Sequence, residues 1–238
     1  MRRRCLPTNE RSVQIPVDDV TIEGNLRIPP AARGIVAFAH GSGSSRFSPR
    51  NRYVANVLER AGLATLLLDL LTQREEVVDQ LTAQLRFDIR LLAERLVAAT
   101  DWLAQQPETR ELGLGYFGAS TGAAAGLIAA ADRADVVRAV VSRGGRPDLA
   151  GDALARLRAP TLLIVGGKDE VVIQLNKAAL QQLRTEKRLE IVPGATHLFE
   201  EPGTLEEVAR LARDWFLRYL APTEGRSASH AAGAANDH

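Results

Sequence analysis

The stretch of chain that decides the fold reads Leu112-Gly-Leu-Gly-Tyr-Phe-Gly-Ala-Ser-Thr-Gly-Ala-Ala-Ala-Gly126. It places a Gly-x-Ser-x-Gly pattern, Gly118 to Gly122, between an apolar run (112–117) and an alanine-rich segment (122–131) that predicts a helix. In that setting the pattern forms a tight turn that strains the serine backbone and points its hydroxyl out of the sheet. We therefore predict Ser120 as a nucleophile. The alternative is a nucleotide-binding turn, but no second glycine cluster with a ribose-binding acid supports it.

Working outward, further short runs are apolar at almost every position, as expected for strands covered on both faces by helices in a parallel sheet. They are Ile35–Ala39, Ala64–Leu68, Val136–Val141, Thr161–Val165 and Leu189–Val192. Before them, Ser12–Val17 and Thr21–Ile28 alternate apolar and polar residues around Asp18-Asp19, which predicts an antiparallel hairpin.

Helical periodicity fills the segments between these runs. Apolar residues at spacings of three and four from Val78 to Leu103 predict one continuous helix, and 204–220 predicts the last one, with Thr204 and Glu207 as a capping box. Alternating strands and helices predict an α/β fold: a doubly wound, mostly parallel sheet with an antiparallel N-terminal hairpin. We expect a flexible N-terminus (1–10), a single domain (11–220) and a disordered tail (221–238).

The composition excludes several classes of protein. The 238 residues include 30 basic and 29 acidic side chains, a formal net charge of +1, so we expect no nucleic-acid partner. Cys5 is the only cysteine, which excludes an intrachain disulfide and cysteine-based metal sites and favours a reducing compartment. No signal-peptide core or membrane-length apolar stretch is present, so we expect a soluble, cytoplasmic protein without a membrane partner. A homodimer is compatible with the sequence.

The serine needs a base, and histidine is the usual one. Of the four histidines, His230 and His238 lie in the tail, and His40 is followed by Gly41, which suggests a loop-shaping role. His197 follows the strand 189–192 through a turn, so it lies at the carboxyl edge of the sheet, where ligand sites of open α/β sheets are found. A lone loop histidine is more often a surface residue, but elimination and position favour His197 as the base.

The base needs an acid that orients it. Asp169 follows the strand 161–165 through Gly166-Gly167-Lys168, at the same edge and one strand before the histidine. The chain order serine, aspartate, histidine is that of α/β hydrolases. Glu170 is the alternative acid, and helix capping is the alternative role for Asp169.

Donors for a developing oxyanion are expected from two backbone N–H groups. One belongs to Thr121, directly after the nucleophile. The other is expected from the loop His40-Gly41-Ser42-Gly43-Ser44-Ser45, and we choose Ser42, with Gly41 lining the substrate site. A phosphate-binding role for this loop lacks the Gly-Lys-Ser/Thr ending of a P-loop.

Further substrate contacts are expected from Arg143, Arg146 and Leu198, which stand near the same edge. Either arginine can bind a substrate carboxylate through two parallel hydrogen bonds. The alternative is that the arginines are solvated or paired with Asp148 and Asp152. The connection between Val141 and Pro160 is too short for the large lid that α/β hydrolases often carry there, so we expect an open site without a large cap domain.

Together, His40-Gly41, the Gly118–Gly122 motif, Asp169 and Gly194-Ala195-Thr196-His197 resemble the dienelactone hydrolase family of α/β hydrolases, over roughly residues 13–220. The resemblance implies a cofactor-free hydrolase of carboxylic esters or lactones that forms a covalent acyl-enzyme with a small-molecule acyl substrate. Family members that cleave dienelactones use cysteine at the elbow, where this chain has Ser120, so a general esterase-like activity is the safer expectation.

Other functions fit the same residues. A thioesterase or a peptide hydrolase uses the same triad. A non-catalytic binding protein can keep the fold and use the cleft for a ligand, although such proteins usually lose a triad residue.

Overall fold

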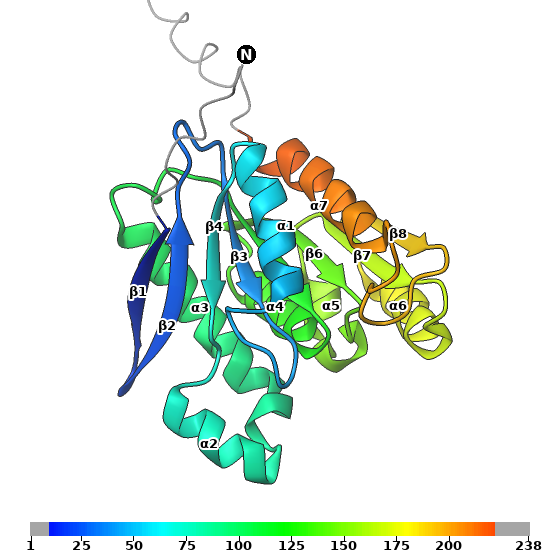
Figure 1. Cartoon of the computed structure of the whole chain (residues 1–238), viewed down its shortest axis with the longest axis horizontal. Helices are drawn as coiled ribbons and strands as arrows, with labels where there is room; N and C mark the ends of the chain where they lie inside the picture. The colour runs from blue at the N-terminus through cyan, green and yellow to red at the C-terminus, as the bar shows by residue number, and fades with distance from the viewer. Residues whose placement is uncertain (1–9, 222–238) are drawn as a thin grey trace, which may run out of the picture.

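The computed structural model describes residues 10–221, so the predicted flexible N-terminus and disordered tail lie almost wholly outside the described residues. Eight strands form one sheet in the order β1-β2-β4-β3-β5-β6-β7-β8 (Figure 1). The strands are β1 (Glu10–Val17), β2 (Val20–Arg27), β3 (Ile35–Ala39), β4 (Ala64–Leu68), β5 (Leu114–Ala119), β6 (Val137–Arg143), β7 (Thr161–Gly166) and β8 (Lys187–Val192).

Strand direction confirms the predicted mostly parallel sheet. β1 and β2 form an antiparallel hairpin, and β2 joins β4 in antiparallel register. From β4 to β8 all neighbours are parallel. The inner strands β3, β4, β5 and β7 are buried at every position, which explains their unbroken apolar character.

Helices cover both faces of the sheet (Figure 1). One face carries α1 (Pro49–Arg60) and α7 (Thr204–Leu220), whose apolar sides pack on the central strands. The other carries α3 (Ile89–Gln105), α4 (Thr121–Asp132), η2 (Pro147–Ala150), α5 (Ala153–Arg156) and α6 (Glu170–Gln182). This arrangement is the predicted α/β-hydrolase fold.

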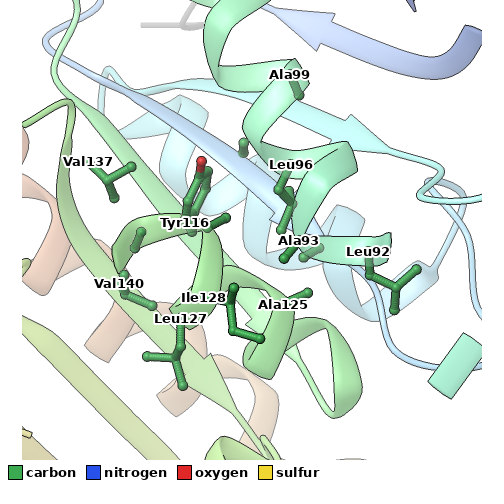
Figure 2. Close-up of a cluster of buried hydrophobic side chains, with 14 of the residues drawn as sticks. Leu92, Ala93, Leu96, Ala99, Tyr116, Ala125, Leu127, Ile128, Val137 and Val140 are labelled. Carbon is green, nitrogen blue, oxygen red and sulfur yellow. The ribbon is translucent and has the colours of Figure 1, made fainter. Parts of the chain in front are cut away.

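The helix after the serine motif is the most deeply buried one. Every residue of α4 from Thr121 to Ala131 is buried, because its alanine and glycine side chains are small enough to let it lie directly on the sheet. Figure 2 shows α4 and α3 packed together over Tyr116 of β5. The Tyr116 hydroxyl is itself buried and hydrogen-bonded to that of Thr100. The serine motif is thus continuous with a helix that is buried along almost its whole length.

The predicted single helix spanning 78–103 is wrong. The chain forms α2 (Gln73–Thr82), then a short 3-10 helix η1 (Leu85–Phe87), and then α3. Ala83 adopts a left-handed conformation (φ 54°) that ends α2, and the Asp88 side chain accepts the Leu91 N–H to begin α3. Only the α3 half of the apolar stripe is buried, while α2 projects beyond the carboxyl edge of the sheet (Figure 1).

The predicted capping box of the last helix is also wrong. Gly203 is the N-cap residue, and it has no side chain with which to cap. Thr204 is the first helical residue, and its hydroxyl donates to the Glu201 carbonyl. The spacing of threonine and glutamate matched the motif, but the helix begins one residue too early for it.

The short connection between β6 and β7 holds only η2 and α5. No cap domain is present within residues 10–221, as predicted. None of the helices within residues 10–221 combines the length and the apolar character that a membrane span requires.

Candidate active site

The nucleophile elbow, residues 118–122, joins β5 to α4. Ser120 has φ 51° and ψ −122°, a strained conformation for any residue with a side chain. A Cβ atom on Gly118 would lie 2.4 Å from Ala123 Cα, and one on Gly122 would lie 2.3 Å from the His40 carbonyl oxygen. Because both contacts are with backbone atoms that cannot move aside, only glycine fits at either position.

A second loop holds the elbow from the side. We call it the arginine loop; it comprises residues 143–146 and begins at the last residue of β6. The Ser120 N–H donates to the Arg143 carbonyl (3.3 Å), and the Arg146 N–H donates to the Ser120 carbonyl (3.1 Å). Both backbone polar groups of the candidate nucleophile are therefore satisfied by this loop, which leaves its hydroxyl as the group that projects from the turn.

The histidine loop, residues 193–201, follows β8. His197 Nδ1 lies 2.6 Å from Asp169 Oδ2. Asp169 stands at the N-cap position of α6 but makes no capping hydrogen bond, because its carboxylate faces the imidazole instead. Glu170, the alternative acid, is exposed. With the Nδ1 proton donated to the carboxylate, Nε2 carries the free lone pair that a general base requires.

The histidine loop also contacts the arginine loop. A Cβ atom on Gly144 would lie 3.5 Å from His197 Cε1 and 3.5 Å from Phe199 Cε2. The arginine loop thus touches both the candidate nucleophile and the candidate base. Among residues 10–221 the Ser120 hydroxyl makes no hydrogen bond, so Ser120 and His197 are not hydrogen-bonded to each other in this structure. Such contacts are often long in the absence of substrate.

His40 serves the loop that follows β3, as expected. The Leu70 N–H donates to His40 Nε2 (3.2 Å), and Nδ1 lies 2.9 Å from the Gly41 carbonyl oxygen, which it can reach only as a donor. Both ring nitrogens of this buried side chain are therefore used by backbone groups. His40 is unavailable as a base, and it fixes the path of the residues that approach Ser120.

The two residues predicted to supply oxyanion donors lie together. The Ser42 N–H donates to Thr121 Oγ1 (3.1 Å), and the two side-chain hydroxyls are 2.9 Å apart. Within the described residues the Thr121 N–H has no hydrogen-bond partner and is free to receive an anion. The Ser42 N–H, in contrast, is occupied by the Thr121 hydroxyl. A Cβ atom on Gly41 would lie 3.0 Å from Ser120 Cβ, so this glycine lies directly against the elbow.

The three residues predicted to contact substrate differ in their surroundings. Arg146 pairs with Asp148 through two hydrogen bonds of 2.9 and 2.7 Å, which is the alternative considered for it. Leu198 is 41% exposed next to His197, as an apolar substrate contact would be. Arg143 is buried, and its Nε and Nη1 atoms have no hydrogen-bond partner.

Three residues that position the site escaped the sequence analysis. Asn176 of α6 donates to the Gly145 carbonyl (3.0 Å) and so supports the arginine loop. Glu201 accepts the Thr196 N–H (3.1 Å), and this bond holds the pKa of Glu201 below its ordinary value. Phe199 is fully buried with φ 56°, unusual for a bulky residue. Only Asn176 left a signal, a polar residue on the apolar side of a helix.

Within residues 10–221, no group of three histidine, cysteine, aspartate or glutamate side chains is arranged to hold a metal ion. A cavity of about 770 Å³ lies at the amino ends of β6, β7 and β8, lined in part by Asp132, Arg156 and Arg184. It is at the edge of the sheet opposite to Ser120, so it does not belong to the candidate active site.

The chain is similar in sequence and in fold to known proteins. The sequence model of the dienelactone hydrolase family matches residues 25–221. A crystal structure described as a dienelactone hydrolase from Anabaena variabilis is 64% identical, with a TM-score of 0.88, over 90% of this chain and 99% of that one. Est1E from Butyrivibrio proteoclasticus is 17% identical (TM-score 0.73, 87% of this chain and 98% of that one), a likeness of fold alone.

A curated relative from Mycobacterium tuberculosis, described as "Putative phosphoribosyl transferase", is 60% identical over 214 residues. The match covers 90% of this chain and 47% of the relative, so the chain spans about half the length of that protein. The description of the relative therefore refers to a protein about twice as long as the matched region.

Proposed function

This chain belongs to the dienelactone hydrolase family, and we propose that it is a serine hydrolase that cleaves carboxylic esters or lactones through an acyl-enzyme on Ser120. The observation that carries the proposal is the pair formed by His197 and Asp169 at the sheet edge that also holds the strained Ser120. A histidine oriented by a carboxylate and a serine held in a strained elbow have no common structural purpose, whereas acyl transfer needs both.

In the first half of the reaction, His197 Nε2 removes the Ser120 hydroxyl proton as Oγ attacks the carbonyl carbon of the substrate. The negative charge that develops on the carbonyl oxygen is received by the free Thr121 N–H. Asp169 stabilises the imidazolium through the 2.6 Å contact with Nδ1. The tetrahedral intermediate collapses when the alcohol leaves with the proton from His197.

In the second half, water replaces the alcohol. His197 removes a proton from the water as its oxygen attacks the acyl carbon, a second tetrahedral intermediate forms, and its collapse releases the acid and returns the proton to Ser120. Ser42 is proposed as the second oxyanion donor. Its N–H becomes available for that role once the Thr121 hydroxyl, which now accepts it, turns toward another partner.

Ester cleavage is favoured by the choice of nucleophile. Since Ser120 replaces the cysteine used by family members that cleave dienelactones, the active oxygen depends on its base for every attack. Leu198 is exposed beside His197, and no cap covers the site within the described residues. Both features leave room for the acyl group of a small ester or lactone.

The proposal is tested with p-nitrophenyl acetate and a fluorophosphonate probe at neutral pH. The full chain should hydrolyse the ester and bind the probe covalently at Ser120, as located by peptide mass spectrometry. Ser120→Ala should abolish both. Ser12→Ala, an exposed serine of β1 far from the site, is the matched control and should behave as wild type.

Three outcomes separate the alternatives. Turnover unaffected by Ser120→Ala would refute the proposed nucleophile. A folded protein that neither turns over esters nor takes the label would instead be a binding protein. Comparing kcat/KM for matched ester, thioester and amide substrates then shows which acyl bond is preferred.

A further inference from the structure

Arg143 is a buried cation without a counter-ion. It is the last residue of β6, beside Ala119 in the sheet register and bonded through its carbonyl to the Ser120 N–H. The residue is 8% exposed, and its Nε and Nη1 atoms are fully covered with no hydrogen-bond partner. Within residues 10–221 no carboxylate forms an ion pair with it.

The covered Nε atoms of Arg27, Arg46 and Arg95 also lack a hydrogen-bond partner, but each of these arginines forms an ion pair and, within the described residues, Arg143 does not. Arg95 is 6% exposed and binds Glu75 at 2.7 Å. Arg46 and Arg27, both largely covered, each contact two carboxylates. A buried charge normally has a partner because removing it from water is energetically costly. Since these three covered arginines are paired, an unpaired guanidinium beside the candidate nucleophile calls for a ligand.

The surroundings of Arg143 carry surplus positive charge. Arg50, in the first turn of α1, is close enough to repel it, and Arg50 is already paired with Glu200 of the histidine loop at 3.2 Å. Burial, followed by this repulsion, lowers the pKa of Arg143 to about 10, so the side chain is still charged at neutral pH. Two cations and one carboxylate leave one positive charge unmatched.

We propose that the Arg143 guanidinium binds an oxyanion of the substrate, a carboxylate or a phosphate, and holds it next to Ser120. Guanidinium is suited to this because its planar fork matches two oxygens of such a group. The proposal rests on the proposed function, since it makes the substrate of that site an anionic acyl compound. Arg143 becomes the residue that decides specificity, while Arg146 is excluded from this role by its pairing with Asp148.

Binding is tested by calorimetric titration of the full chain with adipate and with n-butyl phosphate as the carboxylate and phosphate probes. At least one should bind the wild type, and Arg143→Gln should weaken its affinity at least tenfold. Arg138→Gln, an exposed arginine at the amino end of the same strand, is the matched control and should bind as wild type. The probe that binds identifies the anion. Absence of binding by the wild type, or equal binding by Arg143→Gln, would overturn the proposal.

A second measurement places the anion at Ser120. The probe that binds should slow fluorophosphonate labelling of Ser120 in the wild type and have at least tenfold less effect in Arg143→Gln; protection that is equal in both would overturn the location. If the wild type is never labelled, the proposed function fails, and the titration alone still decides whether Arg143 binds anions.

Two further variants separate a loss of anion binding from a loss of the fold. Arg143→Lys retains the charge and the apolar stem, so it should fold and bind the anion more weakly than wild type because it lacks the fork. Arg143→Met removes an unpaired buried charge and should keep or raise the Tm. A fall of several degrees in Arg143→Met would show that the charge is required by the fold, which contradicts a ligand-binding role.

Discussion

The nucleophile elbow (118–122) and the histidine loop (193–201) meet at one edge of the sheet but are held there in different ways. The elbow is shaped by steric exclusion, since Gly118 and Gly122 lie where any Cβ would overlap the backbone. The histidine loop is mostly exposed and is positioned mainly by polar contacts: the His197–Asp169 bond, the Glu201 carboxylate, and the Lys168 N–H that donates to the Ala195 carbonyl. The buried Phe199 ring and the close packing of Gly166 on the Ala195 and Thr196 carbonyl oxygens add to them.

This difference has consequences for both sequence and energetics. A turn built by exclusion requires glycine at fixed spacing, so it leaves a readable motif, and its disruption should affect folding. A loop built from a few polar contacts requires only particular partners in space. Its disruption should affect catalysis while leaving the fold intact. The following changes test that division, from the largest expected effect to the smallest.

Asp169→Asn should lower kcat for p-nitrophenyl acetate by about three to four orders of magnitude, because an amide no longer selects the Nδ1-protonated tautomer of His197. The Tm should change little, since the bond lies on a partly exposed loop. Glu170→Gln, on the exposed neighbour, is the control and should keep wild-type kcat. Retention of a tenth or more of the activity by Asp169→Asn would remove Asp169 from the mechanism.

Gly122→Ala should destabilise the fold by about 3 kcal/mol or more, because the new methyl group meets the Ala39 and His40 carbonyl oxygens at 2.5 and 2.3 Å. Denaturant unfolding measures the change. Gly126→Ala in the same helix is the matched control, since its Cβ would lie 3.7 Å from Tyr116 Cβ, an ordinary contact. It should stabilise α4 by about 0.5–1 kcal/mol. Equal stabilities of the two variants would refute the steric account of the elbow.

Ser120→Gly should increase the free energy of unfolding by about 1 kcal/mol relative to Ser120→Ala, since glycine adopts φ 51°, ψ −122° without strain and alanine does not. Both variants should be inactive. The comparison separates strain from chemistry because neither residue has a nucleophile. An alanine variant as stable as the glycine variant would indicate that the elbow stores no strain.

Glu201→Ala should lower kcat by about threefold and change the Tm little, because it removes the bond to the Thr196 N–H next to His197 from a partly exposed loop. That bond lowers the pKa of Glu201, so in the wild type it persists as pH falls through the ordinary glutamate range and is lost only below the lowered pKa. At the low pH at which Glu201 becomes protonated, kcat of the wild type should therefore show a decrease that is absent from the variant. Glu206→Ala, exposed in α7, is the control.

Prediction from sequence was most accurate where burial is complete. The strands β3 and β4 were predicted at their observed bounds, and the other inner strands within two residues, because strands buried on both faces are apolar throughout. It was least accurate between Thr72 and Asp88. There the helical spacing continued through a break at Ala83, which depends on a left-handed backbone conformation that apolar periodicity does not report.

The site shows the same limit. The identities and order of Ser120, Asp169 and His197 could be selected from motifs and from their places at strand ends. The sequence could not show which of the two arginines is paired, since both Arg143 and Arg146 follow the same predicted strand. Within the described part of the structure Arg146 is paired and Arg143 is not. The Ser42 N–H was predicted as a donor from its place after His-Gly, but only the folded chain shows that the Thr121 hydroxyl occupies it.

By itself, the sequence determined the fold class, the nucleophile elbow and the sheet edge at which the candidate residues gather, because each depends on local rules: apolar runs, glycine spacing and strand ends. The tertiary structure alone decided the hydrogen bond between His197 and Asp169, the occupied Ser42 N–H and the uncompensated charge of Arg143. These features depend on distances between groups far apart in the chain, and no local pattern of residues encodes such distances.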